Sequence, residues 1–107
     1  MIPPLVAGGA RVRGAAHVYL LRSYRDRTFY LGWTTDPLRR LAEHNAGLSR
    51  FTQRKRPWQL IGVEASPTVG EAKAYERVLK RHPRRLALFK KRLLNQPAAG
   101  RPRPVVG

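Results

Sequence analysis

The 107-residue chain contains no cysteine, few acidic residues and no long apolar run. Without cysteine, disulfide bonds and thiolate metal sites are excluded, and nothing indicates an oxidising compartment. No apolar stretch approaches the ~20 residues that a membrane-spanning helix needs. The N-terminal residues lack the basic start and sustained apolar core of a secretory signal. These absences predict a cytoplasmic protein that does not insert into a membrane.

The scarcity of acidic residues leaves the chain strongly basic. Its 22 Lys and Arg residues outnumber 6 Asp and Glu residues, which gives a formal net charge of +16 at pH 7. Such a one-sided charge creates a positive field that attracts polyanions. Nucleic acid is therefore the first partner to expect, ahead of an anionic membrane surface. Ribosome-associated proteins share this composition, so charge alone indicates a class of partner and not an activity.

The length allows one hydrophobic core and is too short for two domains. Residues 1–15 are rich in Pro, Gly and Ala, and residues 95–107 are rich in Pro and Arg. Neither segment can bury enough apolar surface to offset the entropy cost of ordering it. We therefore expect a flexible N-terminal tail at 1–15, a folded domain at 16–94 and a flexible basic C-terminal tail at 95–107.

Short β-prone runs and capped amphipathic segments predict the secondary structure. Strands are expected at 17–22, 28–33 and 58–64. The helices are bounded by Asp36 and Gly47, by Thr68 and His82, and by Arg84 and Leu94. The order β-β-α-β-α-α predicts an α+β fold in which a small three-stranded antiparallel sheet is flanked by helices.

Glu76 is the most informative polar residue in the sequence. On a helical wheel it falls within an apolar stripe formed by Val69, Ala72, Tyr75 and Leu79. A carboxylate on the buried side of a helix is costly unless it is paired, hydrogen-bonded or bound to a metal ion. From the helix alone, a salt bridge to one of the many arginines is the more common explanation, and metal binding is the alternative.

Arg40 and His44 form a second candidate group because they lie one helical turn apart. They share a flank of the first helix, beside a predicted apolar stripe that includes Leu38, Leu41 and Ala42. A cation beside an imidazole can bind a phosphate and handle a proton near it. Taken alone, two solvated residues on an exposed face are the more common explanation.

Tyr19 and Tyr30 lie in the first two predicted strands. In a suitable register their rings project from the same face of the sheet. A phenol beside a metal ion or a cation can lose its proton more easily than in water, although aromatic residues that simply pack under a helix are common. Gly32 would allow a substrate or a helix to approach closely, or would mark a bulge.

Together these residues resemble the GIY-YIG nuclease superfamily. His17-Val18-Tyr19 and Tyr30-Leu31-Gly32 are similar to its GIY and YIG tripeptides, and residues 34–45 and 51–60 are similar to the segments that follow. Residues 71–80 resemble its metal-binding helix. The resemblance covers about residues 16–82 and is closest to the small standalone bacterial members. His17 stands in place of the glycine of the first tripeptide, which could alter access to Tyr19.

The resemblance implies a role for each candidate residue. It makes Tyr19 the general base, Arg40 the transition-state cation, Tyr30 a residue that positions phosphate and water, His44 an auxiliary active-site group, and Glu76 the ligand of a single Mg²⁺ or Mn²⁺ ion. Phosphodiester hydrolysis needs stabilised charge on the phosphoryl oxygens and a deprotonated in-line water. Because Mg²⁺ can keep several waters, one carboxylate is enough to anchor it.

Basic residues outside this group are expected to hold phosphates on either side of the scissile bond. They are Arg50, Arg54, Lys55 and Arg56 after the first helix, and Lys90, Lys91 and Arg92 on the last. The sequence contains no zinc finger or helix-turn-helix, which favours recognition of DNA shape over DNA sequence.

The sequence therefore predicts a metal-dependent, nucleoid-associated DNA endonuclease. Its expected substrates are branched, damaged or single-stranded DNA, in repair or recombination. The main alternative is a non-catalytic basic nucleic-acid-binding protein that keeps the nuclease fold. A ribosome-associated protein without enzymatic ancestry would explain the charge and leave the ordered motifs unexplained. The sequence does not predict the oligomeric state.

Overall fold

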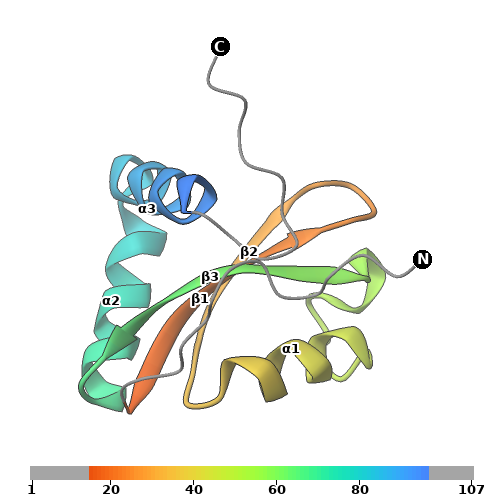
Figure 1. The fold of residues 1–107 in the computed structure, drawn as a ribbon, viewed down its shortest axis with the longest axis horizontal. Helices are drawn as coiled ribbons and strands as arrows, with labels where there is room; N and C mark the ends of the chain where they lie inside the picture. The colour runs from red at the N-terminus through yellow and green to blue at the C-terminus, as the bar shows by residue number, and fades with distance from the viewer. Residues whose placement is uncertain (1–14, 97–107) are drawn as a thin grey trace.

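A computed structural model describes residues 15–96 of the chain (Figure 1). Its elements are β1 (Ala16–Ser23), β2 (Phe29–Thr34), α1 (Pro37–Asn45), the 3₁₀ turn η1 (Gln53–Lys55), β3 (Trp58–Ser66), α2 (Val69–Arg81) and α3 (Pro83–Asn95). The predicted α+β class and the order β-β-α-β-α-α are confirmed. Most of the two predicted tails, residues 1–14 and 97–107, lies outside the described residues. Asn95, predicted as the first residue of the C-terminal tail, is instead the last residue of α3.

The three strands form one antiparallel sheet in the order β2-β1-β3. The register pairs Tyr19 with Gly32 and Leu21 with Tyr30, and an irregularity interrupts the β1–β3 pairing between Leu20 and Leu21. Because β1 is the central strand, both of its faces are covered, and all of its residues except Arg22 are buried. This explains why β1 reads as an almost continuous apolar run rather than an alternating one.

The two faces of the sheet carry separate halves of the core. Val18 and Leu20 pack with residues of α2 and α3 on one face, and Tyr19 and Leu21 pack with Leu41 of α1 on the other. Figure 1 shows the same division, with α2 and α3 on one side of the sheet and α1 on the other. Side chains of neighbouring β1 residues therefore point toward different helices, as strand geometry requires.

Local capping defines where the helices begin. The Asp36 side chain accepts a hydrogen bond from the Arg39 N–H at 3.1 Å, and Thr68 Oγ1 accepts one from the Glu71 N–H at 3.1 Å. Both are N-cap interactions that satisfy free backbone donors of the first turn. Across residues 15–96, no helix combines the length and apolar character needed to cross a membrane.

The predicted apolar stripe of α1 is only partly correct. Leu41 is buried, but Leu38 is 48% exposed and Ala42 also faces solvent. The residues that α1 buries are Pro37, Leu41 and His44. The side of α1 that faces the sheet therefore buries a hydrogen-bonded histidine, His44, as well as the apolar residues Pro37 and Leu41.

Candidate active site

A chain of hydrogen bonds runs through the core between β1 and α1. The Tyr19 hydroxyl lies 2.8 Å from His44 Nε2, and His44 Nδ1 lies 2.7 Å from Thr52 Oγ1. Thr52 Oγ1 in turn donates to the Ser49 carbonyl at 3.5 Å. With the Thr52 proton used in this way, its oxygen accepts from Nδ1–H of His44, and Nε2 accepts from the Tyr19 hydroxyl.

Burial determines the protonation of the two central groups. It raises the pKa of Tyr19 to about 12, against the lowering effect of the Arg40 guanidinium, while Tyr30 and Glu76 raise this pKa further. Burial also lowers the pKa of His44 to about 4, and the positive charge of Arg40 contributes to this shift. At neutral pH the pair is therefore an uncharged phenol donating to an uncharged imidazole.

Gly32 provides the space in which the Tyr19 ring lies. A Cβ atom at this position would lie 2.5 Å from both Cζ and the hydroxyl oxygen of Tyr19. We expected this glycine to accommodate a substrate, a helix or a bulge. That expectation was wrong, because the partner in close approach is the phenol opposite it in the strand register. The two tripeptide segments thus fit together directly, with the glycine of one receiving the tyrosine of the other.

Tyr30 lies on the same face of the sheet as Tyr19, as the sequence predicted. Its ring centroid is 6.4 Å from that of Tyr19, 5.1 Å from that of His44 and 6.2 Å from that of Trp58. Edge contacts of this kind hold aromatic rings in defined orientations. Tyr30 is only half-buried, so part of its ring forms the surface of the site.

Arg40 lies beside the Tyr19 phenol at the surface of the site. Its Nη1 is 2.9 Å from Oε1 of Glu43, and about a third of each side chain is exposed. Glu43 therefore orients the guanidinium, which also hydrogen-bonds the Tyr19 side chain and keeps its remaining donors available for a phosphate. Glu43 was not among the predicted site residues, although its position three residues after Arg40 on the same helix was a usable signal. Thr52 was not predicted either, and the sequence carries no comparable local signal for it.

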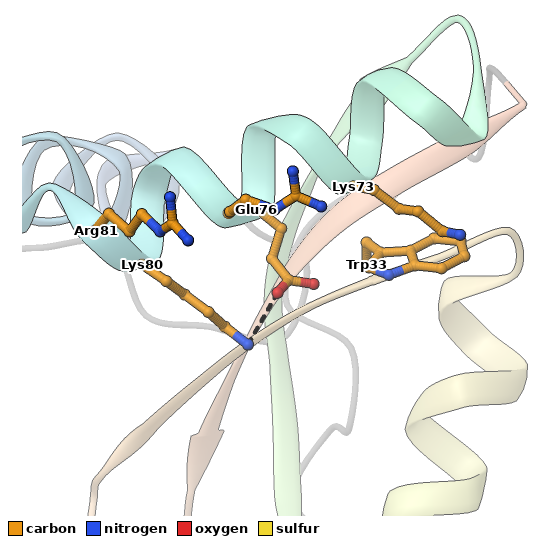
Figure 2. Close-up of a pocket in the computed structure, with 6 residues that line it drawn as sticks. Trp33, Lys73, Glu76, Lys80 and Arg81 are labelled. Carbon is orange, nitrogen blue, oxygen red and sulfur yellow. Dashed lines mark ion pairs between the residues drawn. The ribbon is translucent and has the colours of Figure 1, made fainter.

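Glu76 projects from α2 into a surface pocket of about 340 Å³. Figure 2 shows its carboxylate between Lys80 and Trp33. The side chain is 16% exposed, and Oε1 accepts an ion-pair contact from Lys80 Nζ at 2.9 Å. Glu76 is therefore only partly buried, although its place in the apolar stripe predicted a buried side chain. Its ion-pair partner is Lys80, one turn along the helix, and not one of the arginines. Besides Glu76, the pocket is lined by Trp33, Lys73, Arg77, Lys80 and Arg81.

The α2 pocket adjoins the phenols on the sheet. Lys80 Nζ lies 6.0 Å from the centre of the Tyr30 ring, and Lys73 Nζ lies 5.1 Å from that of Trp33. Glu76 is also close enough to Tyr19 to affect its pKa. Tyr19 of β1, Tyr30 of β2, and Arg40 and His44 of α1 therefore contact one another. Glu76 of α2 lies in the neighbouring pocket and is linked to Tyr30 through Lys80.

A divalent cation at this site would have one protein carboxylate to bind. Within residues 15–96, no group of three or more His, Cys, Asp or Glu side chains is arranged to hold a metal ion. The Glu76 carboxylate supplies the oxygen ligand that a hard cation takes, and the pocket has room for the waters that Mg²⁺ retains. The four cationic side chains that line the same pocket oppose a divalent cation. The Lys80 ammonium, which contacts this carboxylate, would have to move aside.

The predicted phosphate-binding residues fall into two groups on different sides of the sheet. Arg50, Arg54 and Arg56 are exposed on the α1 side, where Lys55 pairs with Asp26 at 3.3 Å. Lys90, Lys91 and Arg92 belong to α3 on the other side. Arg92 is held by Glu64 at 2.8 Å and also contacts the Tyr75 hydroxyl. The two groups therefore do not form one continuous surface next to the phenols.

A comparison with family models matches residues 15–92 to the GIY-YIG catalytic domain. The chain belongs to the GIY-YIG family. Its predicted membership of this nuclease family is thereby confirmed. The two tripeptide segments of this GIY-YIG domain lie on the paired strands β1 and β2 and meet at Tyr19 and Gly32. His17, which replaces the first glycine, is fully buried in β1.

Several curated proteins are similar to this GIY-YIG chain. A UPF0213 protein of Listeria monocytogenes is 36% identical over 74 residues, which cover 68% of this chain and 82% of that protein. A UPF0213 protein of Streptococcus pneumoniae is 40% identical over 70 residues, which cover 64% of this chain and 70% of that protein. Structure-specific endonuclease subunit SLX1 of Meyerozyma guilliermondii is 38% identical over 74 residues, covering 63% of this chain and 25% of SLX1.

One solved structure is also similar to the chain. It is the solution NMR structure of a UPF0213 protein from Bacillus halodurans, with 32% sequence identity and a TM-score of 0.45. The match covers 73% of this chain and 83% of that protein.

Proposed function

We propose that this protein is a metal-dependent DNA endonuclease that selects its substrates by shape. Branched, damaged or single-stranded DNA would be cleaved, in repair or recombination at the nucleoid. The observation that supports the proposal is the contact among Tyr19, Tyr30, Arg40 and His44, with Lys80 between the Tyr30 ring and the Glu76 carboxylate. A fold that only bound nucleic acid would not need a buried phenol–imidazole pair beside a carboxylate pocket.

The geometry suggests a role for each of these side chains in phosphodiester hydrolysis. Arg40, oriented by Glu43, would bind the scissile phosphate and stabilise the negative charge that develops on it. His44 would hold the Tyr19 hydroxyl in place by accepting its hydrogen bond. Tyr30, at the edge of the same aromatic cluster, would position the phosphate and the attacking water.

Tyr19 can act as a base only if its pKa falls below the raised value that burial gives it. Glu76 contributes to that raised pKa through its negative charge. A Mg²⁺ or Mn²⁺ ion held by Glu76 would supply Lewis-acid chemistry, and its charge would offset that of the carboxylate. This coupling gives a physical reason for activity to depend on a divalent cation.

The substrate class is supported by charge and by one relative. The net charge of +16 favours binding to the DNA backbone whatever its sequence. The SLX1 relative is named as a structure-specific endonuclease subunit, and this domain corresponds to a quarter of its length. By analogy with the name of this relative, we propose that this chain also selects DNA by its shape.

A cleavage assay with two matched variants tests the proposal. Wild-type protein, Glu76→Gln and Glu71→Gln are each incubated with branched, single-stranded and supercoiled DNA, in Mg²⁺ or in chelator. Glu71 lies on the same helix and is exposed, so its variant controls for the loss of one acid on α2. We expect cleavage by the wild type and Glu71→Gln in Mg²⁺ only, and none by Glu76→Gln. Cleavage that persists in chelator or in Glu76→Gln would disprove the assigned mechanism.

A non-catalytic nucleic-acid-binding protein is the second candidate. It is favoured by the Glu76–Lys80 ion pair, which already neutralises the carboxylate, and by the raised pKa of Tyr19. In that case wild-type protein would bind each DNA and cleave none in Mg²⁺ or Mn²⁺. The same assay therefore separates the two candidates.

A further inference from the structure

The loop between α1 and η1 exposes two large apolar side chains. Phe51 is 84% exposed and Leu48 is 74% exposed, the highest values for large hydrophobic residues in the range 15–96. Leaving a phenylalanine in water forgoes the favourable free energy that its burial would contribute. Two large apolar side chains on one exposed loop make it a candidate surface for contact with another molecule.

The loop presents Phe51 from a rigid support. Arg50 and Phe51 are the central residues of a turn in which the Ser49 carbonyl accepts from the N–H of Thr52 at 3.2 Å and of Gln53 at 3.0 Å. Ser49 and Thr52, on either side of this pair, are both buried. The Thr52 carbonyl also accepts from Nε1 of Trp58 at 2.9 Å. The ends of the turn are therefore anchored in the core while its centre projects into solvent.

The same anchor connects Phe51 to the candidate active site. Thr52, the next residue, hydrogen-bonds His44 Nδ1 at 2.7 Å, and His44 hydrogen-bonds Tyr19. Phe51 is thus separated from the catalytic hydrogen-bond chain by a single peptide unit. A molecule that contacts the turn would lie on the α1 side of the sheet, which is also the side of Tyr19, Tyr30 and His44.

The charges around Phe51 indicate what that molecule is. Arg50, Arg54 and Arg56 are exposed on the same segment, and residues 46–57 contain no acidic side chain. An exposed aromatic ring among arginines is the combination that binds single-stranded nucleic acid, because bases stack on the ring while cations hold the phosphates. An apolar protein partner would gain little from this density of positive charge.

We propose that Phe51, supported by Leu48, is a stacking platform for an unpaired DNA base close to the scissile phosphate. The inference rests on the proposed function and identifies a feature of its substrate. In an intact duplex the bases are paired and stacked on one another, so they cannot stack on Phe51 without disruption. Junctions, flaps, damaged sites and single strands offer such a base, and the platform would therefore select for them.

The test measures binding in chelator, so that cleavage plays no part. Fluorescence anisotropy follows wild-type protein, Phe51→Ala, Phe51→Trp and Leu88→Ala on a labelled single strand, a forked duplex and a fully paired duplex. Leu88 is an exposed apolar residue on α3, across the sheet from the turn, and serves as the matched control. Since Phe51 is exposed, its removal should leave the thermal midpoint unchanged.

Phe51→Ala should weaken binding to the single strand and the fork by about 5- to 150-fold, the equivalent of about 1–3 kcal/mol for one stacked base. Affinity for the duplex should change by less than about twofold, Phe51→Trp should retain wild-type affinities, and Leu88→Ala should behave as wild type. A 2-aminopurine base next to the junction should change its fluorescence with the wild type and not with Phe51→Ala.

Equal effects of Phe51→Ala on all three DNAs, or no effect on any, would overturn the inference. Loss of self-association in Phe51→Ala with unchanged DNA binding would also overturn it and assign the surface to a second copy of the chain. The proposed function can fail separately, because a protein that cleaves no DNA could still show the stacking effect. Conversely, cleavage that depends on Glu76 with no effect of Phe51→Ala would reject the platform alone.

Discussion

Replacing Gly32 with alanine is a direct test of how the two tripeptide segments fit together. The added Cβ would lie 2.5 Å from Cζ and the hydroxyl of Tyr19, well inside van der Waals contact. The ring cannot move freely, because Tyr19 is buried and its hydroxyl is bonded to His44 at 2.8 Å. Either the strands separate locally or the ring shifts and loses this hydrogen bond.

The expected cost follows from these two contributions. Overpacking a filled core costs about 1–3 kcal/mol. Leaving a buried hydroxyl and imidazole without their hydrogen bond costs about 1–3 kcal/mol more. We therefore expect Gly32→Ala to lower the free energy of unfolding by about 2–6 kcal/mol. For a domain of this size this corresponds to a fall in melting temperature of roughly 10–50 °C.

Urea denaturation followed by circular dichroism measures this difference, with Gly70→Ala as the control. Gly70 is a helical glycine in α2 whose Cβ would meet only Thr68 Oγ1 at 3.9 Å, so alanine there should be neutral or slightly stabilising. In a double-mutant cycle, Tyr19→Leu should remove most of the cost of Gly32→Ala, since the clashing ring is gone. A loss below about 1 kcal/mol in Gly32→Ala, or costs that simply add in the double variant, would refute the proposed fit.

Two further predictions concern the ionisable groups of the site. Burial lowers the pKa of His44 from 6.5 to about 4, so its contribution to stability is present above pH 6.5 and is lost as the pH falls toward 4. Urea midpoints measured across this range should decline in the wild type and decline less in His44→Gln, and parallel curves would contradict the assignment. Because Lys80 contacts the Glu76 carboxylate, Lys80→Gln should bind Mn²⁺ several-fold more tightly by calorimetry, while Glu76→Gln should not bind it. An unchanged affinity in Lys80→Gln would show that the lysine does not compete with the cation.

Much of the architecture was predictable because it depends on local rules. Asp36 and Thr68 cap their helices through side-chain contacts with residues three positions away. Tyr19 and Tyr30 share a face because alternate residues of a strand point the same way and the hairpin register places the two rings together. These relations involve few residues at short range, so the sequence pattern already contains them.

His44 shows where the local rules stop. Its helical position was compatible with an exposed polar residue, yet its side chain is fully buried. It can be buried because Tyr19, 25 residues away, and Thr52, eight residues away and beyond the end of α1, supply a partner for each ring nitrogen. The exposure of Leu38 on the same helix has the same origin, since the orientation of α1 also follows from these contacts.

The amino-acid sequence alone determined the order of the elements, the helix caps, the positive charge and the shared face of Tyr19 and Tyr30. Only the tertiary structure decided that Tyr19 occupies the space left by Gly32, that Thr52 reaches His44, and that the basic residues lie on two sides of the sheet. The physical reason is that capping and strand alternation act between near neighbours. Burial, close approach and most hydrogen-bond partners depend instead on which distant segments pack together.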